Sequence, residues 1–421
     1  MIIKGEEIRK NEQYTQKSDI EKAKQKKCVA IQIGLVGGAP LSLLQHYLII
    51  QKNGYDTIIC ITPGNNDYLQ AKYEKEFGKI IDKKSSAELW NESKIIKSFL
   101  QYRWDYRLIQ KERPDLVVVL GVFNAALYSY ICKKMGIPMI VYIAGGTLDN
   151  QGQIIKLWKN CEVICFSKEN EDEIIKHYVH DHVHVISNRI LIPERFNDIE
   201  THYQTEQSEI HVLITSRLAE DKIQSIYSLI RLLSQCASKS AHIVVRIAGD
   251  GPVKDELLSF CNKMNTDELT IQYLGHLDKL TEQFRWAHIA AGKGRSVIEP
   301  IMMNRIGCII GEDGKIGFCN EKDFENLYHY NFSGRNLETE DSLNEMRKMI
   351  EKINKGAVEY EDVIIPSELV NDNYSAEYLP EKLRNVLEVL PQPKKRRSRA
   401  FLPIQFSRVI ISKIKERMIN S

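Results

Sequence analysis

The chain has 421 residues, which is long for a single hydrophobic core, so we expect two domains. Hydrophobic residues make up 43% and charged residues 27%, as is typical of globular proteins. The net charge is +2, but residues 394–421 hold nine Lys or Arg and one Glu, hence +8, which leaves −6 for the rest. This acidic body argues against a nucleic-acid-binding protein.

The cysteines and the N-terminus indicate the compartment. Nine cysteines are scattered without a CxxC pair, which argues against a disulfide framework or a zinc site and for a reducing compartment. Residues 1–27 are charged and polar, so we expect a flexible extension and no signal peptide. The most apolar run, 116–132, is too short to span a bilayer. We therefore expect a cytoplasmic protein.

The first half of the chain alternates strands with helices. Predicted strands occupy residues 28–36, 57–61, 116–120, 139–143, 162–166 and 183–186. This alternation predicts a doubly wound α/β domain over 28–200. Gly37 and Gly38 follow the first strand and would let a ligand or a facing domain approach the backbone. An ordinary tight turn explains them equally well.

The second half repeats the alternation after a polar linker at 188–207. Predicted strands occupy residues 209–215, 242–247, 269–273 and 307–310, with another ending near Ala291. They predict a second Rossmann-like domain over 201–370. A helical segment at 371–390, broken at Pro380, is expected to return to the N-terminal domain. Residues 391–421 form a basic amphipathic tail.

Four histidines crowd the end of the first domain: His177, His180, His182 and His184. The last two would share one strand face, so a metal site is conceivable. No Cys, Asp or Glu in the local sequence completes a ligand pattern. We interpret them as surface or interface histidines.

The segment 290–311 carries the strongest functional pattern. A strand ends in a Gly-Lys-Gly turn, and a helix predicted at 297–304 follows with Ser296 as its N-cap. Free N–H groups at the helix start, beside Lys293 and Arg295, would make an anion site. One turn further, Glu299 is suited to accept hydrogen bonds from sugar hydroxyls. The pattern favours a nucleotide-sugar, and an unspecialised strand–turn–helix is the alternative.

Two further cations belong to the same expected sheet edge. Arg217 and Lys222 lie in the segment after the first strand of the second domain. Ligands of open α/β sheets bind at the carboxyl ends of the strands. The two side chains could therefore clamp a diphosphate, although a solvated charged loop is the alternative.

Taken in order, these segments resemble group 1 (family 4 type) glycosyltransferases of the GT-B fold, over about residues 28–390. The resemblance rests on the GGA turn, PDLVVVLG, ICFSKENE, the Asn-Arg-Ile linker, TSRLAEDK, IAGDGP, YLGHL and GKGRSVIEPIM. It implies two Rossmann-like domains facing across a cleft, and sugar transfer from a nucleotide-sugar, usually with retention and without a metal or other cofactor.

The resemblance also implies roles for individual residues. Arg217 and Lys222 would hold the donor diphosphate, and Glu299 would bind the ribose. The loop facing the distal phosphate would comprise Gly292, Lys293, Gly294, Arg295 and Ser296. The loop beside the base would comprise Gly275, His276 and Leu277. Gly37 and Gly38 would approach the donor from the other domain.

The sequence departs from the family pattern twice. Ala291 stands where the family has the first acid of its E-x7-E motif, which puts the donor sugar in doubt. Val122, Phe123 and Asn124 stand where many members have a histidine, so no catalytic residue of the N-terminal domain can be named. The leaving diphosphate would be stabilised electrostatically and would itself deprotonate the acceptor.

The expected function is sugar transfer to a glycan or lipid-linked acceptor in cell-surface polysaccharide or glycolipid synthesis. A GT-B nucleotide-sugar epimerase is one alternative. A non-catalytic glycosyltransferase-like partner, suggested by Ala291, is another. The polybasic segment and the amphipathic pattern at 401–419 predict peripheral binding to an anionic membrane surface, against the alternative of a disordered basic tail.

Overall fold

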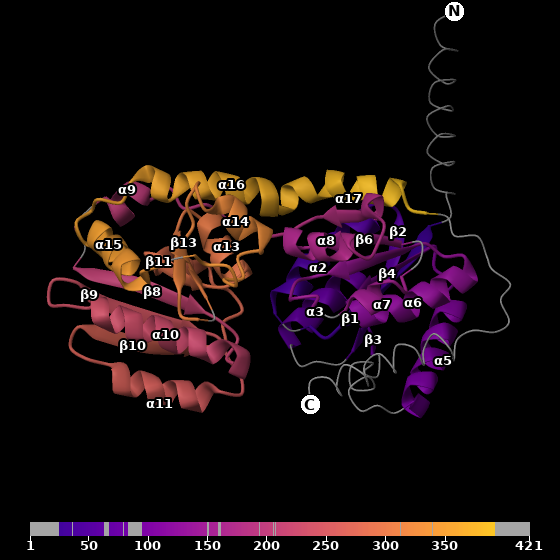
Figure 1. The fold of residues 1–421 in the computed structure, drawn as a ribbon, viewed down its shortest axis with the longest axis horizontal. Helices are drawn as coiled ribbons and strands as arrows, with labels where there is room; N and C mark the ends of the chain where they lie inside the picture. The colour runs from indigo at the N-terminus through magenta and orange to yellow at the C-terminus, as the bar shows by residue number, and fades with distance from the viewer. Residues whose placement is uncertain are drawn as a thin grey trace, which may run out of the picture.

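The computed structural model describes residues 25–391 except 36, 63–66, 79, 83–94, 150, 159–160, 193, 205, 207, 312 and 339. The predicted extension, apart from its last three residues, and the predicted tail after residue 391 lie outside this part. Both predicted α/β domains are present, so the fold class is confirmed. Figure 1 shows the first domain in indigo and magenta and the second in pink and orange.

The N-terminal domain contains a parallel sheet of seven strands in the order β3-β2-β1-β4-β5-β6-β7. The strands are β1 (Lys26–Ile33), β2 (Tyr55–Thr62), β3 (Ile81–Asp82), β4 (Leu116–Leu120), β5 (Met139–Ile143), β6 (Cys161–Cys165) and β7 (Val183–Val185). The helices are α2 (Gly38–Lys52), α3 (Asp67–Phe77), α5 (Ile95–Glu112), α6 (Val122–Met135), α7 (Gly152–Ile155) and α8 (Lys168–Ile175), with a 3-10 turn η1 (His180–His182). Helices cover both faces, which is why β4 and β5 are continuous apolar runs.

The C-terminal domain has six strands in the order β10-β9-β8-β11-β12-β13, and only β13 runs antiparallel to its neighbour. The strands are β8 (Glu209–Thr215), β9 (His242–Ala248), β10 (Leu269–Gly275), β11 (Ile289–Gly292), β12 (Ile306–Ile310) and β13 (Ile316–Phe318). The helices are α9 (Ile199–Tyr203), α10 (Glu220–Cys236), α11 (Lys254–Met264), α12 (Thr281–Trp286), α13 (Arg295–Met302), α14 (Phe324–His329) and α15 (Ser342–Asn354), with η2 (Tyr360–Asp362).

The final helices join the two domains. Figure 1 shows α16 (Ile364–Tyr374) over the C-terminal domain and α17 (Leu379–Glu388) over the N-terminal domain. Leu379, Leu383 and Val386 of α17 belong to the core cluster that α2 also lines. The predicted break at Pro380 is wrong: the chain leaves the helix at Ser375 and passes through η3 (Ala376–Tyr378). Pro380 occupies the first turn of α17, where no N–H is needed.

The predicted linker is more ordered than expected. It contains α9, which buries Ile199 and Tyr203, four residues apart, in the core of the C-terminal domain. Arg305, whose side chain is fully buried, donates from Nη1 and Nη2 to the two oxygens of Asp198, at 3.0 and 2.9 Å. This bidentate pair attaches the middle of the linker to the C-terminal domain.

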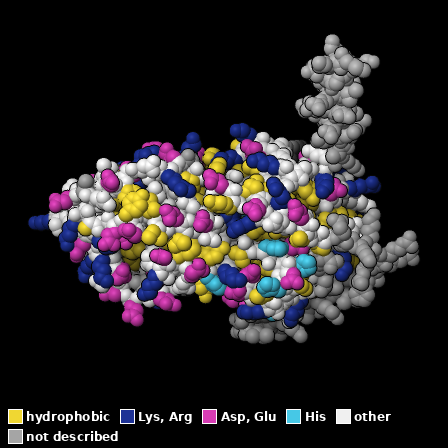
Figure 2. Space-filling view, turned by 90° about the horizontal axis from the view of Figure 1, so that it is seen from above, with side chains coloured by type: hydrophobic (Ala, Val, Ile, Leu, Met, Phe, Trp, Pro, Cys, Tyr) yellow, Lys and Arg dark blue, Asp and Glu magenta, His cyan; other side chains and the backbone are white. Residues whose placement is uncertain are grey.

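Charged side chains of both signs are interspersed on the face shown in Figure 2, with histidines gathered over the N-terminal half. Side chains also connect the domains directly. Arg335 of the C-terminal domain pairs with Glu169 at the start of α8, and His329 of α14 lies 3.6 Å from Asp172 of α8. These contacts place α8 and α14 against each other.

Candidate functional site

The loops after β8 and β9 lie together at the carboxyl ends of these strands, and their close packing depends on two glycines of the second loop. Gly249 and Gly251 have φ angles of 152° and 157°, where side chains are strained. A Cβ added at Gly249 would lie 1.8 Å from the Ser216 carbonyl oxygen, and one at Gly251 would lie 2.0 Å from that of Leu218. The Leu218 N–H donates to the Asp250 carbonyl at 3.0 Å. The glycine loop therefore fixes the backbone that carries Arg217.

Arg217 and Lys222 converge on one carboxylate. Arg217 Nη2 lies 3.3 Å from Asp221 Oδ1, and Lys222 Nζ lies 3.4 Å from Asp221 Oδ2. Burial raises the pKa of Asp221, but Lys222 and Arg217 outweigh it and hold the pKa below its usual range. Lys222 is not in a loop as predicted, because α10 begins at Glu220 and places it in the first helical turn. An anion at this helix start would compete with Asp221 for both cations.

The turn from β11 into α13 is tight and packs closely against the end of β8. A Cβ at Gly292 would lie 2.6 Å from Ser296 Cβ and 3.0 Å from the Thr215 carbonyl oxygen, at the end of β8. Ser296 is not the N-cap: Gly294, with φ of 57°, holds that position, and no side chain caps the helix. The predicted helix 297–304 is therefore displaced by two residues at each end. The half-buried Lys293 lies on this turn, beside an uncapped helix start.

Arg295 and Glu299 lie one turn apart on α13 and form an ion pair. Arg295 Nε donates to Glu299 Oε1 at 2.8 Å, and Nη2 lies 2.5 Å from the same oxygen. The Arg295 side chain is 15% exposed and that of Glu299 23%. Prediction placed Arg295 beside a phosphate and Glu299 beside a ribose, and the structure brings the two together.

The N-terminal domain contacts this pair through the start of α2. Gly37 has φ of 86° and precedes the helix, as the tight-turn interpretation requires. A Cβ at Gly38 would lie 2.8 Å from Arg295 Cδ. Gly38 thus allows the close approach of a facing domain, which was one of the two predicted explanations.

The segment between the domains completes the interface with a chain of hydrogen bonds. Ser42 Oγ donates to Asn188 Oδ1 at 3.2 Å, and Asn188 Nδ2 donates to Asn331 Oδ1 at 3.1 Å. Tyr374 of α16 donates to the same Asn331 oxygen at 3.2 Å. Arg189, 1% exposed, donates to the Ser375 carbonyl at 3.1 Å, and burial lowers its pKa to about 10.

These interface residues were missed as site residues because their contacts are long-range. One local signal was present: Gly38, Ser42 and His46 recur every four residues on α2, a spacing normally filled by apolar side chains on a buried face. His46 is fully buried, and burial together with Arg189 lowers its pKa well below the usual value.

The loop after β10 lies beside the glycine loop of β9. Gly275 has φ of 73° and accepts from the Gly249 N–H at 2.8 Å. His276 lies 3.2 Å from Asp278 and is exposed, while Leu277 packs against the small cluster around Phe284. The loop predicted beside a base is therefore joined, through Gly275, to the glycine loop that packs on Ser216.

The structure shows where the two departures from the family pattern lie. Ala291 is 0% exposed and belongs to the hydrophobic core of the C-terminal domain, so an acid there would be buried among aliphatic side chains. Val122, Phe123 and Asn124 form the first turn of α6, where Asn124 donates to the Leu120 carbonyl at 3.3 Å. Neither position supplies an acid or a base.

The crowded histidines have an acid partner that the local sequence did not reveal. Glu162 of β6 is fully buried, and its two oxygens lie 2.8 Å from His182 Nδ1 and 2.7 Å from His184 Nε2. Over the described part of the chain, no group of three His, Cys, Asp or Glu side chains could hold a metal ion.

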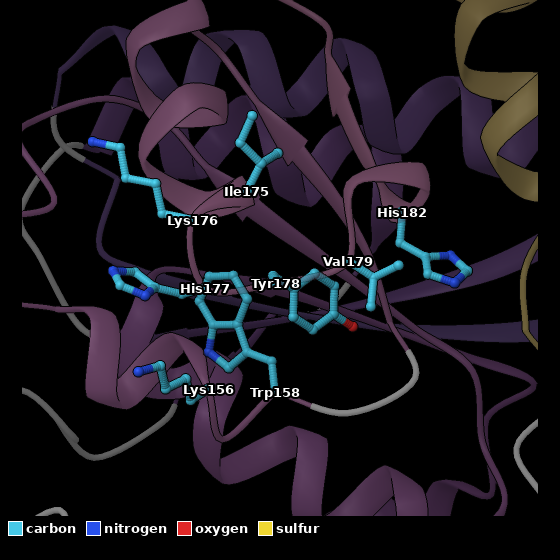
Figure 3. A pocket seen from close by; sticks show the side chains of 8 residues that line it. All are labelled: Lys156, Trp158, Ile175, Lys176, His177, Tyr178, Val179 and His182. Carbon is cyan, nitrogen blue, oxygen red and sulfur yellow. The ribbon is translucent and has the colours of Figure 1, made fainter.

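Beside these histidines, a pocket of about 550 Å³ opens on the N-terminal domain (Figure 3). Its lining residues are Lys156, Trp158, Ile175, Lys176, His177, Tyr178, Val179 and His182. None of them belongs to the predicted donor-binding set, so this pocket is separate from the site between the domains.

No family model matches the sequence, and no curated protein matches it. Solved structures do. A glycosyltransferase from Rickettsia africae is 16% identical with a TM-score of 0.62, over 87% of this chain and 100% of that one. HepE from Anabaena in complex with UDP is 13% identical with a TM-score of 0.61, over 87% of this chain and 100% of that one.

TarM from S. aureus, in complex with UDP, fondaparinux and α-GlcNAc-glycerol, is 13% identical with a TM-score of 0.59, over 86% of this chain and 99% of that one. All three likenesses extend over both domains. The chain has the GT-B fold. Membership of the family 4 type stays a prediction, because identities this low establish only the fold.

Proposed function

We propose that the protein is a glycosyltransferase that moves a sugar from a nucleotide-sugar to a glycan or lipid-linked acceptor. The observation that carries the proposal is that the two segments predicted to bind phosphate lie at one edge of the same sheet. The Arg217 loop and the start of α13 follow the adjacent parallel strands β8 and β11. The side chain of Arg295, at the start of α13, lies against Gly38 of the other domain, so a diphosphate at this edge would lie near the contact between the domains.

In this proposal each element has one task. Arg217, Lys222 and the N–H groups at the start of α13 stabilise the charge that develops on the leaving diphosphate. Glu299 accepts from the ribose hydroxyls, and the loop at Gly275 adjoins the base. The chemistry needs no metal, and transfer proceeds with retention, the leaving phosphate taking the proton of the acceptor hydroxyl.

The structural neighbours support a uridine nucleotide as the first donor class to examine. The HepE and TarM structures contain UDP, and the TarM structure also contains glycan ligands. Another neighbour, WaaB, is described as a lipopolysaccharide outer core galactosyltransferase, with 14% identity and a TM-score of 0.57. On this basis we propose a hexosyl donor and a role in cell-surface polysaccharide or glycolipid synthesis.

The test is a screen of UDP-, GDP-, ADP- and dTDP-sugars for release of free nucleoside diphosphate, with and without glycan acceptors. Release from at least one donor supports the proposal. Conversion of a donor into its epimer without release would instead identify a GT-B epimerase. Neither release nor binding of any nucleotide would refute the proposal.

Ala291 favours a second candidate, a nucleotide-binding protein that transfers no sugar. Its side chain lies in the core, so the donor sugar lacks the acid that the resemblance leads one to expect. This candidate predicts nucleotide binding that depends on Arg217 and Lys222, but no turnover with any donor and acceptor pair.

We also propose that residues 394–421 attach the protein to the anionic inner face of the cell membrane, with the two domains in the cytoplasm. The segment lies outside the described residues, and the proposal rests on its +8 charge. Each Lys or Arg near an anionic leaflet contributes about 1 kcal/mol within a Debye length. None of the described helices has the length and hydrophobicity to cross a bilayer.

Co-sedimentation with vesicles tests this attachment. The full chain should pellet with vesicles containing phosphatidylserine at low salt and stay in solution with neutral vesicles. A chain ending at Leu390 should stay in solution with both. Equal behaviour of the two chains would refute a membrane role for the tail.

A further inference from the structure

One guanidinium connects the predicted ribose-binding acid to the opposite domain. Arg295 belongs to α13 of the C-terminal domain, but its Nη1 donates to Ser42 Oγ of α2 at 3.2 Å and to the Arg189 carbonyl at 3.2 Å. Its Nε and Nη2 meanwhile contact Glu299. A single planar fork therefore joins three segments: α13, α2 and the connection between the domains.

The Arg295 contacts leave one oxygen of Glu299 for a ligand. Both guanidinium contacts go to Oε1. Among the described residues, no donor lies within hydrogen-bond distance of Oε2. A carboxylate held through one oxygen keeps the other in a fixed direction, at little entropic cost when a hydroxyl arrives.

The surroundings hold Arg295 in this position. Gly38 leaves room for its aliphatic stem, since a Cβ there would lie 2.8 Å from Cδ and 3.3 Å from Cγ. Ser42 is fully buried and is itself fixed by Asn188. The side chain of Arg295 is 15% exposed, so its hydrogen bonds are partly shielded from water.

We propose that Arg295 is a positioning residue that aims Glu299 at the ribose and makes nucleotide binding depend on the contact between the domains. This inference rests on the proposed function. Nucleotide bound at Glu299 strengthens the bridge to Ser42, and the assembled bridge in turn raises nucleotide affinity, because coupling between two sites is reciprocal.

A purely structural role is the competing explanation. An interdomain ion pair that only stabilises the fold would change the melting temperature and leave nucleotide affinity alone. Nucleotide affinity in a double-mutant cycle separates the two explanations, because Gly38 and Arg295 lie in different domains.

The cycle combines Gly38→Ala with Arg295→Ala. The backbone of Gly38 does not have a positive φ, so alanine strains nothing except the contact with Arg295 Cδ. Dissociation constants for UDP, GDP, ADP and dTDP are measured by calorimetry on the four full-length proteins, with circular dichroism to show that each is folded. We expect Gly38→Ala to weaken the tightest-binding nucleotide about 5-fold and Arg295→Ala about 10-fold. The double variant should bind no more weakly than Arg295→Ala alone.

Two further variants separate geometry from charge. Arg295→Lys keeps the charge but cannot hold Glu299 and Ser42 at once, so it should bind nucleotide as weakly as Arg295→Ala. Ser42→Ala removes the bond from Arg295 to α2, together with the bond that Ser42 donates to Asn188. It should weaken nucleotide binding about 2- to 3-fold, with no effect on affinity when Arg295 is already alanine.

The outcomes distinguish this inference from the proposed function. Suppose that the wild-type protein binds a nucleotide while the fold-losses in affinity of Gly38→Ala and Arg295→Ala multiply in the double variant. In that case Arg295 does not position Glu299, and the inference is overturned while the proposed function stands. Full affinity in Arg295→Lys would overturn it as well. If the wild-type protein binds none of the four nucleotides, the proposed function fails, and this inference fails with it.

Discussion

Replacing Gly249 by alanine perturbs the proposed donor site without touching a charged residue. The new Cβ would lie 1.8 Å from the Ser216 carbonyl oxygen, whereas Cβ contacts under 3.0 Å are not seen in proteins. Because that oxygen belongs to the backbone, the loop must move by about 1.2 Å, the difference between these two distances. Arg217 is the next residue and moves with it.

The size of the effect follows from this displacement. A misplacement of about 1 Å typically costs about 10²-fold in rate, equivalent to about 2.7 kcal/mol of barrier. Overpacking of a rigid contact costs about 1–3 kcal/mol of stability, and a side chain in this region of φ adds about 1–3 kcal/mol. We therefore expect Gly249→Ala to lose about 100-fold in turnover and about 3 kcal/mol in the free energy of unfolding.

Steady-state transfer and urea unfolding provide the assay, with Gly54→Ala as the matched control. Gly54 also has a positive φ of 88°, but a Cβ there meets nothing within 4 Å, and it lies in a turn of the other domain. The control should lose about 1 kcal/mol of stability and no turnover. A folded Gly249→Ala protein with wild-type turnover would refute the reasoning.

Three other predictions follow from the site and from the residues that support it. Arg217→Ala or Lys222→Ala should abolish transfer and leave the melting temperature nearly unchanged, because the Arg217 side chain is exposed and that of Lys222 is 33% exposed; turnover near that of the wild type would remove them from the mechanism. Glu299→Gln should weaken nucleoside diphosphate binding about 10-fold by calorimetry, since a charged acceptor becomes neutral; an unchanged dissociation constant would leave Glu299 only a structural role. Burial lowers the pKa of His202 to about 4 from its ordinary 6.5, so the stability that it contributes is full above pH 6.5 and is lost as the pH falls toward 4. Between pH 7 and pH 4.5 the unfolding free energy of His202→Gln should fall less than that of the wild-type protein. An identical pH dependence in the two proteins would show that His202 does not cause the loss of stability.

Local patterns predicted the regular parts of the fold. The strands at 116–120 and 139–143 have the predicted bounds, because strands buried on both faces are apolar throughout. Ser167, a residue type that favours this position, is the N-cap of α8, and its hydroxyl accepts from the Asn170 N–H at 3.3 Å. Because an N-cap contact joins residues two or three positions apart, it can be predicted from the local sequence.

Other features depend on contacts that no local pattern reveals. Ser296 is a better capping residue than Gly294, yet Gly294 starts α13, because its N–H donates to the distant Phe332 carbonyl at 2.8 Å. The pairing of Arg305 with Asp198 joins positions 107 residues apart and anchors, just before α9, a segment that looks like a linker.

The site divides in the same way. The glycines and charged residues within one loop were identifiable from their spacing, whereas the ion pair between Arg295 and Glu299 was not. An i, i+4 Arg–Glu pair is usually a surface feature, and here contacts with Ser42, 253 residues away from Arg295, make it part of the interface. Ala291 shows the reverse, since the family motif has an acid at this position and this chain has a buried core residue there.

The central claim is that a nucleotide-sugar binds between the Arg217 loop and the start of α13 and loses its diphosphate there. The most direct measurement is release of free nucleoside diphosphate from a panel of nucleotide-sugars, with the wild-type protein beside Arg217→Ala. We predict release from at least one donor by the wild-type protein and none by the variant. Equal release by both proteins, or neither release nor nucleotide binding by the wild-type protein, would contradict the claim.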